Sequence, residues 1–314
     1  MPKGGKPKAQ ISKTSYRGTT WIDVTNPTAA TIKKLSKDIK LHPLDVEDIL
    51  SPAQRPKLER QKDYLFLIFR FPRTTRQGTR VRPTELDVVI APKLIITFHG
   101  SDLSPVQSIH ADAKILTNRK QELFSDGTAS VLRQILQRLF EEIYVHTDAV
   151  SRELDALETH VFKRSAQRRT IDDIAQLRRK IIDYRRIAKP QSNFLKQAES
   201  AIAERVPVHS KVYWRNLVEI TDGQWELLEN FRETIEGLAD TSDSLFNHRL
   251  NQVFRLLTVI SVTFLPATFV IDLFDLDVPG APLVNTEGGF FAVMAIVIVV
   301  ELIFIGFLRR RRVL

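Results

Sequence analysis

Two apolar segments near the C-terminus constrain the fold of this 314-residue chain more than any other feature. Residues Leu256 to Ile271 form a run of 16 without a charged side chain, and Gly288 to Val300 form a second run of 13. With Glu301 included, the second segment covers 19 residues, Phe290 to Leu308, and stops at four arginines. About 20 apolar residues in a helix span a bilayer. We therefore predict two membrane-spanning helices, the alternative being a buried hairpin of a soluble protein.

The basic residues orient these two helices. Arg249 and Arg255 flank the first segment on its N-terminal side, and Arg309 to Arg312 follow the second. The connecting loop, Val278 to Gly289, contains no Lys or Arg. Basic residues accumulate on the cytoplasmic side of membrane helices. We expect a multi-pass protein of the cell (inner) membrane with both termini in the cytoplasm.

Composition argues against several other classes of protein. The chain has no cysteine, so disulfides, thiolate metal sites and cysteine nucleophiles are excluded. The net charge of +9 comes mostly from the two ends, and the nearly neutral body offers no basic groove for nucleic acid. The seven histidines show no HExxH spacing, and no Gly-rich phosphate loop stands between a strand and a helix. We expect neither an enzyme nor a covalently bound cofactor.

The N-terminal part has the pattern of an α/β domain. Short helices are expected at Thr28–Lys40 and Leu44–Leu50. Short β-branched and aromatic runs predict strands at Trp21–Val24, Tyr64–Phe71, Glu85–Ile90 and Leu94–Phe98.

The following region changes character. From about Thr128 to Phe254, apolar residues recur three and four apart, which predicts long helices, one of them interrupted near Pro190. The last of these helices leads without a break into the first apolar segment.

We divide the chain into a disordered basic tail (1–18), a cytoplasmic α/β domain (19–125), long helices including a stalk (126–252), a first transmembrane helix that lines a pore (253–275), an extracytoplasmic loop (276–289), a second transmembrane helix (290–308) and a basic cytoplasmic tail (309–314).

Two spanning helices of one chain cannot enclose a water-filled path, so transport requires several copies around an axis. Polar residues of the first segment fall on one face because they follow at steps of three and four. This stripe runs through Asn251, Phe254, Leu257 or Thr258, Ser261, Leu265, Thr268, Asp272 and Asp275. Lipid disfavours Asp, so the stripe is expected to face protein or water. Ser261 and Thr268 have a second interpretation, in which their hydroxyls bond only to their own helix.

Acidic residues gather at the outer end of the first helix. Asp272, Asp275 and Asp277 form an acidic mouth that concentrates cations if several copies meet there. Oxygen ligands favour magnesium or calcium and tolerate manganese, cobalt or zinc. In the second helix, a charged Glu301 facing lipid is costly. Glu301 is therefore expected to be protonated or bonded to the first helix, with Thr263 at a similar depth.

Several short motifs, taken in order, resemble one known family. They are Trp21-Ile22-Asp23-Val24-Thr25-Asn26-Pro27, Leu41-His42-Pro43-Leu44, Glu47-Asp48-Ile49-Leu50, Gln54-Arg55-Pro56-Lys57-Leu58-Glu59, Tyr184-Arg185-Arg186 with Pro190-Gln191, and Phe264-Leu265-Pro266-Ala267-Thr268-Phe269. From about Trp21 to its C-terminus, the chain resembles the CorA-type divalent metal cation transporters, relatives of the ZntB zinc transporters. The family's Gly-Met-Asn signature is replaced by Asp275-Leu276-Asp277.

The resemblance implies a fold and a function. The fold is a funnel-shaped homopentamer with an α/β cytoplasmic N-terminal domain, a long α-helical stalk and two C-terminal transmembrane helices. The function is transport of magnesium, or of zinc, cobalt or nickel, driven by the electrochemical gradient. The resemblance assigns polar lining to Asn251 and Thr268, gates to Leu257 and Leu265, and an acidic cytoplasmic ring to Asp240. The alternative, suggested by the lost signature, is a non-conducting or regulatory membrane scaffold.

Overall fold

The computed structural model describes residues 9–35, 39–51, 55–75, 78, 80–163, 168–205, 211–275 and 288–310. A six-stranded sheet has the order β1-β2-β6-β5-β4-β3. Its strands are β1 (Gln10–Tyr16), β2 (Thr19–Thr25), β3 (Lys57–Arg60), β4 (Leu65–Thr74), β5 (Val81–Ala91) and β6 (Leu94–His99). Only β2 and β6 pair in parallel, while the other neighbouring strands are antiparallel.

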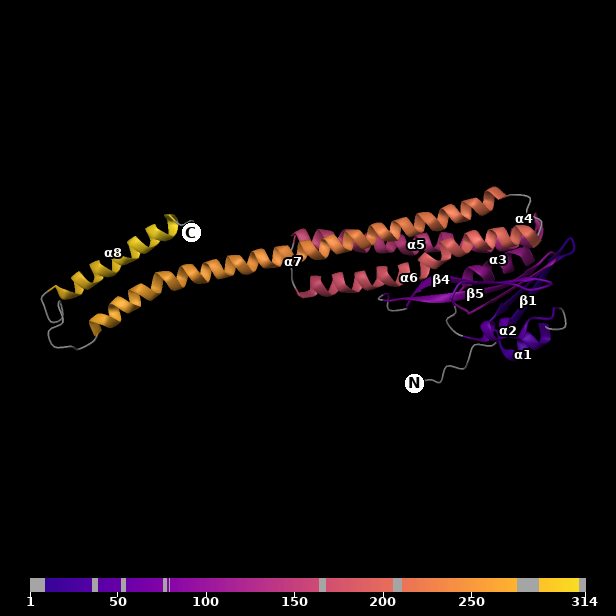
Figure 1. The fold of residues 1–314 in the computed structure, drawn as a ribbon, viewed down its shortest axis with the longest axis horizontal. Helices are drawn as coiled ribbons and strands as arrows, with labels where there is room; N and C mark the ends of the chain where they lie inside the picture. The colour runs from indigo at the N-terminus through magenta and orange to yellow at the C-terminus, as the bar shows by residue number, and fades with distance from the viewer. Residues whose placement is uncertain are drawn as a thin grey trace. The chain divides into compact units, whose positions relative to one another are not determined.

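Helices cover both faces of this sheet (Figure 1). The helices are α1 (Ala29–Leu35), α2 (Pro43–Leu50), α3 (Ser104–Ile115), α4 (Thr117–Leu123), α5 (Gly127–Lys163), α6 (Arg168–Arg205), α7 (Lys211–Asp275) and α8 (Gly289–Arg310). The predicted α/β domain, long helices and two apolar C-terminal helices are confirmed.

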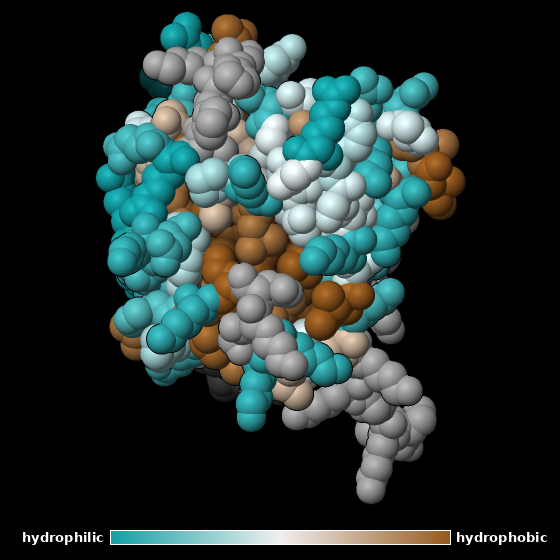
Figure 2. Space-filling view, turned by 90° about the vertical axis from the view of Figure 1, so that its right-hand side faces the viewer, coloured by the Kyte–Doolittle hydropathy of each residue, from teal (hydrophilic) through white to brown (hydrophobic). Residues whose placement is uncertain are grey.

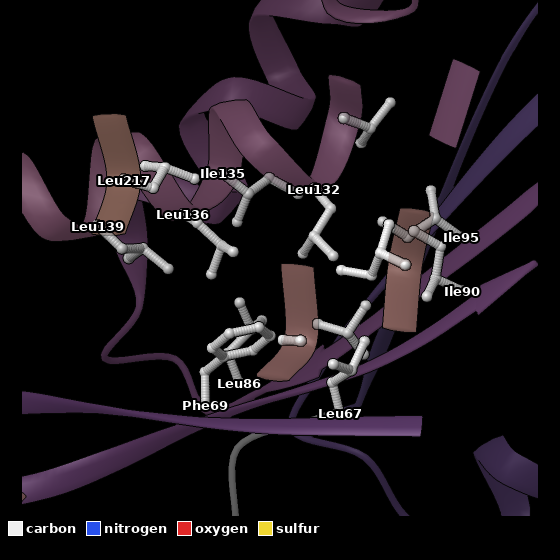
Figure 3. Packing of buried hydrophobic residues seen from close by; sticks show 14 of the residues in the cluster. Leu67, Phe69, Leu86, Ile90, Ile95, Leu132, Ile135, Leu136, Leu139 and Leu217 are labelled. Carbon is white, nitrogen blue, oxygen red and sulfur yellow. The ribbon is translucent and has the colours of Figure 1, made fainter. Parts of the chain in front are cut away.

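The main hydrophobic core lies between the sheet and the long helices. Figure 3 shows Leu67 and Phe69 of β4 beneath Leu132 and Leu136 of α5, with Leu217 of α7 at the edge of the cluster. The heptad-like spacing of the α5 residues places them on one face of the helix. Complete burial of each such side chain contributes about 1.5–3 kcal/mol. This core fixes α5 against the sheet.

A second core covers the opposite face of the sheet. Phe66 and Ile68 of β4 pack there with Ile32 of α1 and Ile49 of α2. Successive strand residues point to opposite faces, so Leu65, Leu67 and Phe69 enter the first core and the residues between them enter the second. A strand buried on both faces has a continuous apolar sequence. The apolar run predicted as a strand at Tyr64–Phe71 is of this kind.

The sequence prediction was wrong at the N-terminus. Residues 10–16 were assigned to a disordered tail, but they form β1, which pairs antiparallel with β2 in the register Ile11 to Val24 and Thr14 to Trp21. The strand is an edge strand with polar side chains, so it lacks the apolar run used to recognise the central strands. Pairing along seven residues stabilises it instead.

The predicted interruption near Pro190 was also wrong, because α6 continues through it from Arg168 to Arg205. Proline removes one amide donor from a helix and usually breaks or kinks it. Neighbouring residues are held from outside the helix: Gln191 Nε2 donates to the carbonyl of Arg70 at 2.5 Å, and Ser192 Oγ donates to Asp222. Tertiary contacts therefore keep this part of α6 in place.

The chain divides into two compact units, Met1–Ala239 and Asp240–Leu314, and α7 begins in the first and ends in the second. On the face of the first unit in Figure 2, hydrophilic side chains surround a smaller apolar area. In contrast, α7 and α8 each contain a segment long and apolar enough to cross a membrane, and neither segment is buried within the chain. No break in α7 marks the point where the apolar segment begins.

Candidate functional site

The predicted polar stripe lies on one exposed face of α7, which we call the polar face. At about 100° per residue, Asn251, Phe254, Leu257, Ser261, Leu265, Thr268 and Asp272 all fall on this face. Each of these residues is exposed in the single chain. Even the apolar members are open, with Leu257 52% and Leu265 68% exposed. Nothing in the described part of this chain covers the polar face.

The opposite face of α7 is partly covered. It consists of residues that are less exposed than their neighbours, namely Val259, Val262, Thr263, Pro266, Ala267 and Val270. A similar partly covered face of α8 contains Val293, Val297, Val300, Glu301 and Ile305. We infer that α7 and α8 of one chain pack through these two faces. The polar face then points away from α8.

Two threonine hydroxyls of α7 bond to their own helix, which agrees with the second interpretation for Thr268. Thr268 Oγ1 donates to the carbonyls of Phe264 and Leu265, both at 3.0 Å. Thr258 Oγ1 likewise donates to the carbonyl of Phe254 at 2.8 Å. These bonds use the hydroxyl proton and leave oxygen lone pairs free to accept. Thr268 can therefore still present oxygen to a cation or its hydration shell.

The acidic mouth is only partly described. Asp272 is exposed on α7, and Asp275 is the last residue of the helix. The side chain of Asp275 and the whole of Leu276 and Asp277 lie outside the described residues.

The polar face continues toward the N-terminus of α7 through residues that sequence reasoning missed. Asp240 is exposed, and a rise of about 1.5 Å per residue places it about 48 Å along α7 from Asp272. Asp243 and Asn247 lie between Asp240 and Asn251 at steps of three and four, and both are exposed. The same spacing rule that found the stripe in the apolar segment would have found them, had it been applied further toward the N-terminus.

One chain does not assemble a metal site from the described residues. Among them, no group of three or more His, Asp or Glu side chains lies close enough to hold an ion. Asp45 and Asp48 of α2 are used within the chain: Asp45 accepts from Tyr64 Oη at 2.5 Å, and Asp48 pairs with Lys57 at 2.8 Å. Burial and the bond to Asp45 raise the pKa of the Tyr64 phenol.

A buried ion pair joins the parallel strands β2 and β6. His99 Nδ1 lies 2.6 Å from the carbonyl oxygen of Gly100, and Nε2 lies 3.1 Å from Asp23 Oδ1. Both oxygens accept hydrogen bonds, so these two contacts favour the imidazole that carries a proton on each ring nitrogen. Burial alone lowers the pKa of His99, but the hydrogen bond and charge of Asp23 outweigh it, so the pKa is raised. This pair is structural and far in sequence from the polar face.

The folded N-terminal unit, the helix with one open polar face and the second apolar helix define a membrane protein. The chain belongs to the family described as CorA-like Mg2+ transporter protein, whose model matches residues 16–311. This is a family of ion transporters, not of enzymes. The family resemblance stated from the sequence motifs is confirmed.

Individual relatives agree with the family match. The cobalt/magnesium transport protein CorA of Thermotoga maritima is 22% identical over 93% of this chain and 83% of its own length. The zinc transport protein ZntB of Pectobacterium carotovorum subsp. carotovorum is 24% identical over 86% of this chain and 80% of its own length. The solved CorA magnesium transporter from Methanocaldococcus jannaschii matches with a TM-score of 0.80 at 22% identity, covering 96% of this chain and 97% of that one. The likeness to this structure confirms the fold.

Proposed function

We propose that the chain forms a homopentamer that transports divalent cations along a central path lined by the polar faces of five α7 helices. Magnesium is one candidate substrate, and zinc, cobalt or nickel are the others. The membrane potential drives the ion, since each elementary charge contributes about 2.3 kcal/mol per 100 mV. The cation is the substrate, and both termini lie in the cytoplasm beneath the inner membrane.

The exposure pattern of α7 carries this proposal. The face toward α8 is partly covered, whereas the face with Asn251, Ser261, Thr268 and Asp272 is open in the single chain. Lipid is a poor solvent for an ionised carboxylate. When several copies of α7 turn their polar faces toward a common axis, these polar groups contact water and one another rather than lipid.

Each level of the polar face then has a separate role. Asp272, Asp275 and Asp277 collect cations outside, with Leu276 between the last two, and Thr268, Ser261 and Asn251 line the path. Leu257 and Leu265 close it, because an apolar constriction excludes water. Asp240 meets the ion at the cytoplasmic end. We propose that Asp275 and Asp277 contact the metal directly, since an ionised carboxylate competes with water better than an amide does.

Ion flux into liposomes tests the acidic mouth. In the double variant Asp275→Asn, Asp277→Asn, we expect flux at low cation concentration to fall and the concentration for half-maximal flux to rise, because the local cation concentration drops. The matched control is Glu287→Gln, which removes an acid of the same connecting segment outside α7. Unchanged flux and unchanged ion preference in the double variant would contradict the proposal that the acidic mouth collects cations.

A non-conducting scaffold is the second candidate, and the Asp-Leu-Asp sequence in place of Gly-Met-Asn favours it. The same liposomes separate the two candidates. Absence of flux for magnesium, zinc, cobalt, nickel and calcium in the unmodified protein supports the scaffold. Flux of any of these ions excludes it.

A further inference from the structure

Glu301 is the only ionisable side chain of α8 between Gly289 and Phe307. Both of its carboxyl oxygens are shielded from solvent, and neither has a hydrogen-bond partner within the part of the chain that the structure describes. An ionised carboxylate in apolar surroundings is costly unless it is paired. The group therefore needs a proton, a hydrogen-bond partner, or both.

The position of Glu301 on α8 shows where a partner has to lie. Glu301 is on the partly covered face with Val297 and Val300, whereas Ile298 and Leu302 on other faces are 53% and 63% exposed. It is 12 residues from the start of α8 at Gly289, or about 18 Å along the helix. The shielding of the carboxyl on this face indicates a neighbouring helix, and the part of α7 from Asp240 onward belongs to the same compact unit.

The facing side of α7 offers one hydroxyl at a matching depth. Thr263 lies 12 residues before the end of α7 at Asp275. Consecutive spanning helices are antiparallel, so Thr263 and Glu301 are equally far from the connecting segment. The other residues of this α7 face near that depth are apolar, namely Val259, Val262, Pro266, Ala267 and Val270. The basic residue on this side of α7, Arg255, lies eight residues before Thr263, or about 12 Å along the helix.

Pro266 leaves a backbone carbonyl on the same face without its usual hydrogen-bond donor. Proline has no amide hydrogen, so the carbonyl of Val262 lacks its usual donor four residues later. An unsatisfied carbonyl within a bilayer is costly. A protonated carboxyl has one donor and can also accept, and α7 presents an acceptor at Val262 and a donor at Thr263. The hydrogen-bond donor and acceptor of a protonated Glu301 on α8 therefore match the acceptor at Val262 and the donor at Thr263 on α7.

We propose that Glu301 is a proton-binding site within the membrane that ties α8 to α7. Its carboxyl holds a proton and donates it in a hydrogen bond to the carbonyl of Val262, and it accepts from Thr263 Oγ1. The consequence for transport depends on the proposed function, because the tie holds the opposite face of α7 toward the path. Glu301 is a positioning residue and does not contact the ion.

Carbodiimide labelling tests the proton directly. Dicyclohexylcarbodiimide adds to a neutral carboxyl in apolar surroundings: the carboxyl oxygen bonds to the carbodiimide carbon, and the carboxyl proton moves to nitrogen. We expect mass spectrometry of the full-length protein in lipid to find the adduct on the α8 peptide at neutral pH. Glu301→Gln is the matched control and should abolish it. An unlabelled α8 peptide, with the reagent shown to react with the same sample elsewhere, overturns the proton site.

A double-mutant cycle tests the tie to α7. We expect Glu301→Leu and Thr263→Val each to reduce flux about threefold to tenfold. The loss should be larger for Glu301→Leu, which removes both proposed hydrogen bonds, than for Thr263→Val, which removes one. The double variant should be no worse than Glu301→Leu, and Glu301→Gln, which keeps a donor and an acceptor, should stay near the unmodified protein. Additive losses, or equal losses for Gln and Leu, overturn the tie. If the unmodified protein does not conduct, the proposed function fails alone, and the same cycle is read from thermal midpoints in detergent.

Discussion

The two units of the molecule treat their polar groups in opposite ways. In the first unit, the buried carboxylates Asp23 and Asp45 are each satisfied inside the chain, by His99 and Thr97 and by Tyr64 and Gln61. In the second unit, Asp240, Asp243 and Asp272 are exposed on α7 and have no ion-pair partner among the described residues. These two carboxylates of the first unit are satisfied within a single chain, whereas Oδ1 of the buried Asp87 in the same unit has no hydrogen-bond partner among the described residues. In the proposed pentamer, other copies of the chain surround the polar face of α7.

Leucine side chains also differ between the two units, being buried in the first and exposed on the polar face in the second. Two matched substitutions measure what this difference contributes to stability and to flux. Leu132 is fully buried against the sheet, whereas Leu265 is 68% exposed on the polar face. We expect Leu132→Ala to lower the free energy of unfolding of the first unit by about 2–5 kcal/mol, because it leaves a cavity. We expect Leu265→Ala to change it by less than about 0.5 kcal/mol and to increase cation leak through the gate. Thermal melts and liposome flux give the two readouts.

A reversed outcome would break the comparison. If Leu265→Ala destabilised the first unit as much as Leu132→Ala, the two units would not be energetically separate. If it left the leak unchanged, Leu265 would not close the path.

A smaller effect is expected from a single buried hydroxyl of the first unit. Tyr64 Oη donates to Asp45 and accepts from the amide of His42 at 2.7 Å. Tyr64→Phe keeps the ring but leaves a fully buried carboxylate short of one donor. We expect a loss of about 1–3 kcal/mol in the free energy of unfolding, the cost of an unsatisfied buried polar group. Denaturant titration of the full-length protein measures this loss, with Tyr213→Phe on a half-exposed ring as the control.

Residues that belong to repeating patterns could be predicted from the sequence. The central strands, α5 and the polar face of α7 repeat at two or at three to four residues, and such periods report directly on which side is buried. Edge strand β1 and the unbroken α6 could not be predicted, because pairing with β2 and the contacts of Gln191 and Ser192 decide them. The helix and strand preferences of a short segment do not report such tertiary contacts. The roles of Asp275 and Asp277 depend on other copies, so they remain predictions.

The smallest expected effect concerns the pH dependence of the buried pair of the first unit. The pKa of His99 is raised by Asp23, so between the unfolded value of about 6.5 and the folded value the folded state binds the extra proton. The stabilisation is fully present below about pH 6.5 and is lost as the pH rises through the folded pKa. His110, whose pKa is lowered by burial, acts in the opposite sense at low pH. Substituting His99 alone separates the two.

Hydrogen exchange in the full-length protein measures this effect at the amides of β2 and β6. We compare the unmodified protein with His99→Gln at each pH, which cancels the intrinsic pH dependence of exchange. The extra protection of the unmodified protein should be largest near pH 6 and should shrink toward pH 9, because a neutral imidazole donates from only one nitrogen and loses its charge attraction to Asp23. A difference that grows with pH would mean that the buried pair between His99 and Asp23 is neutral.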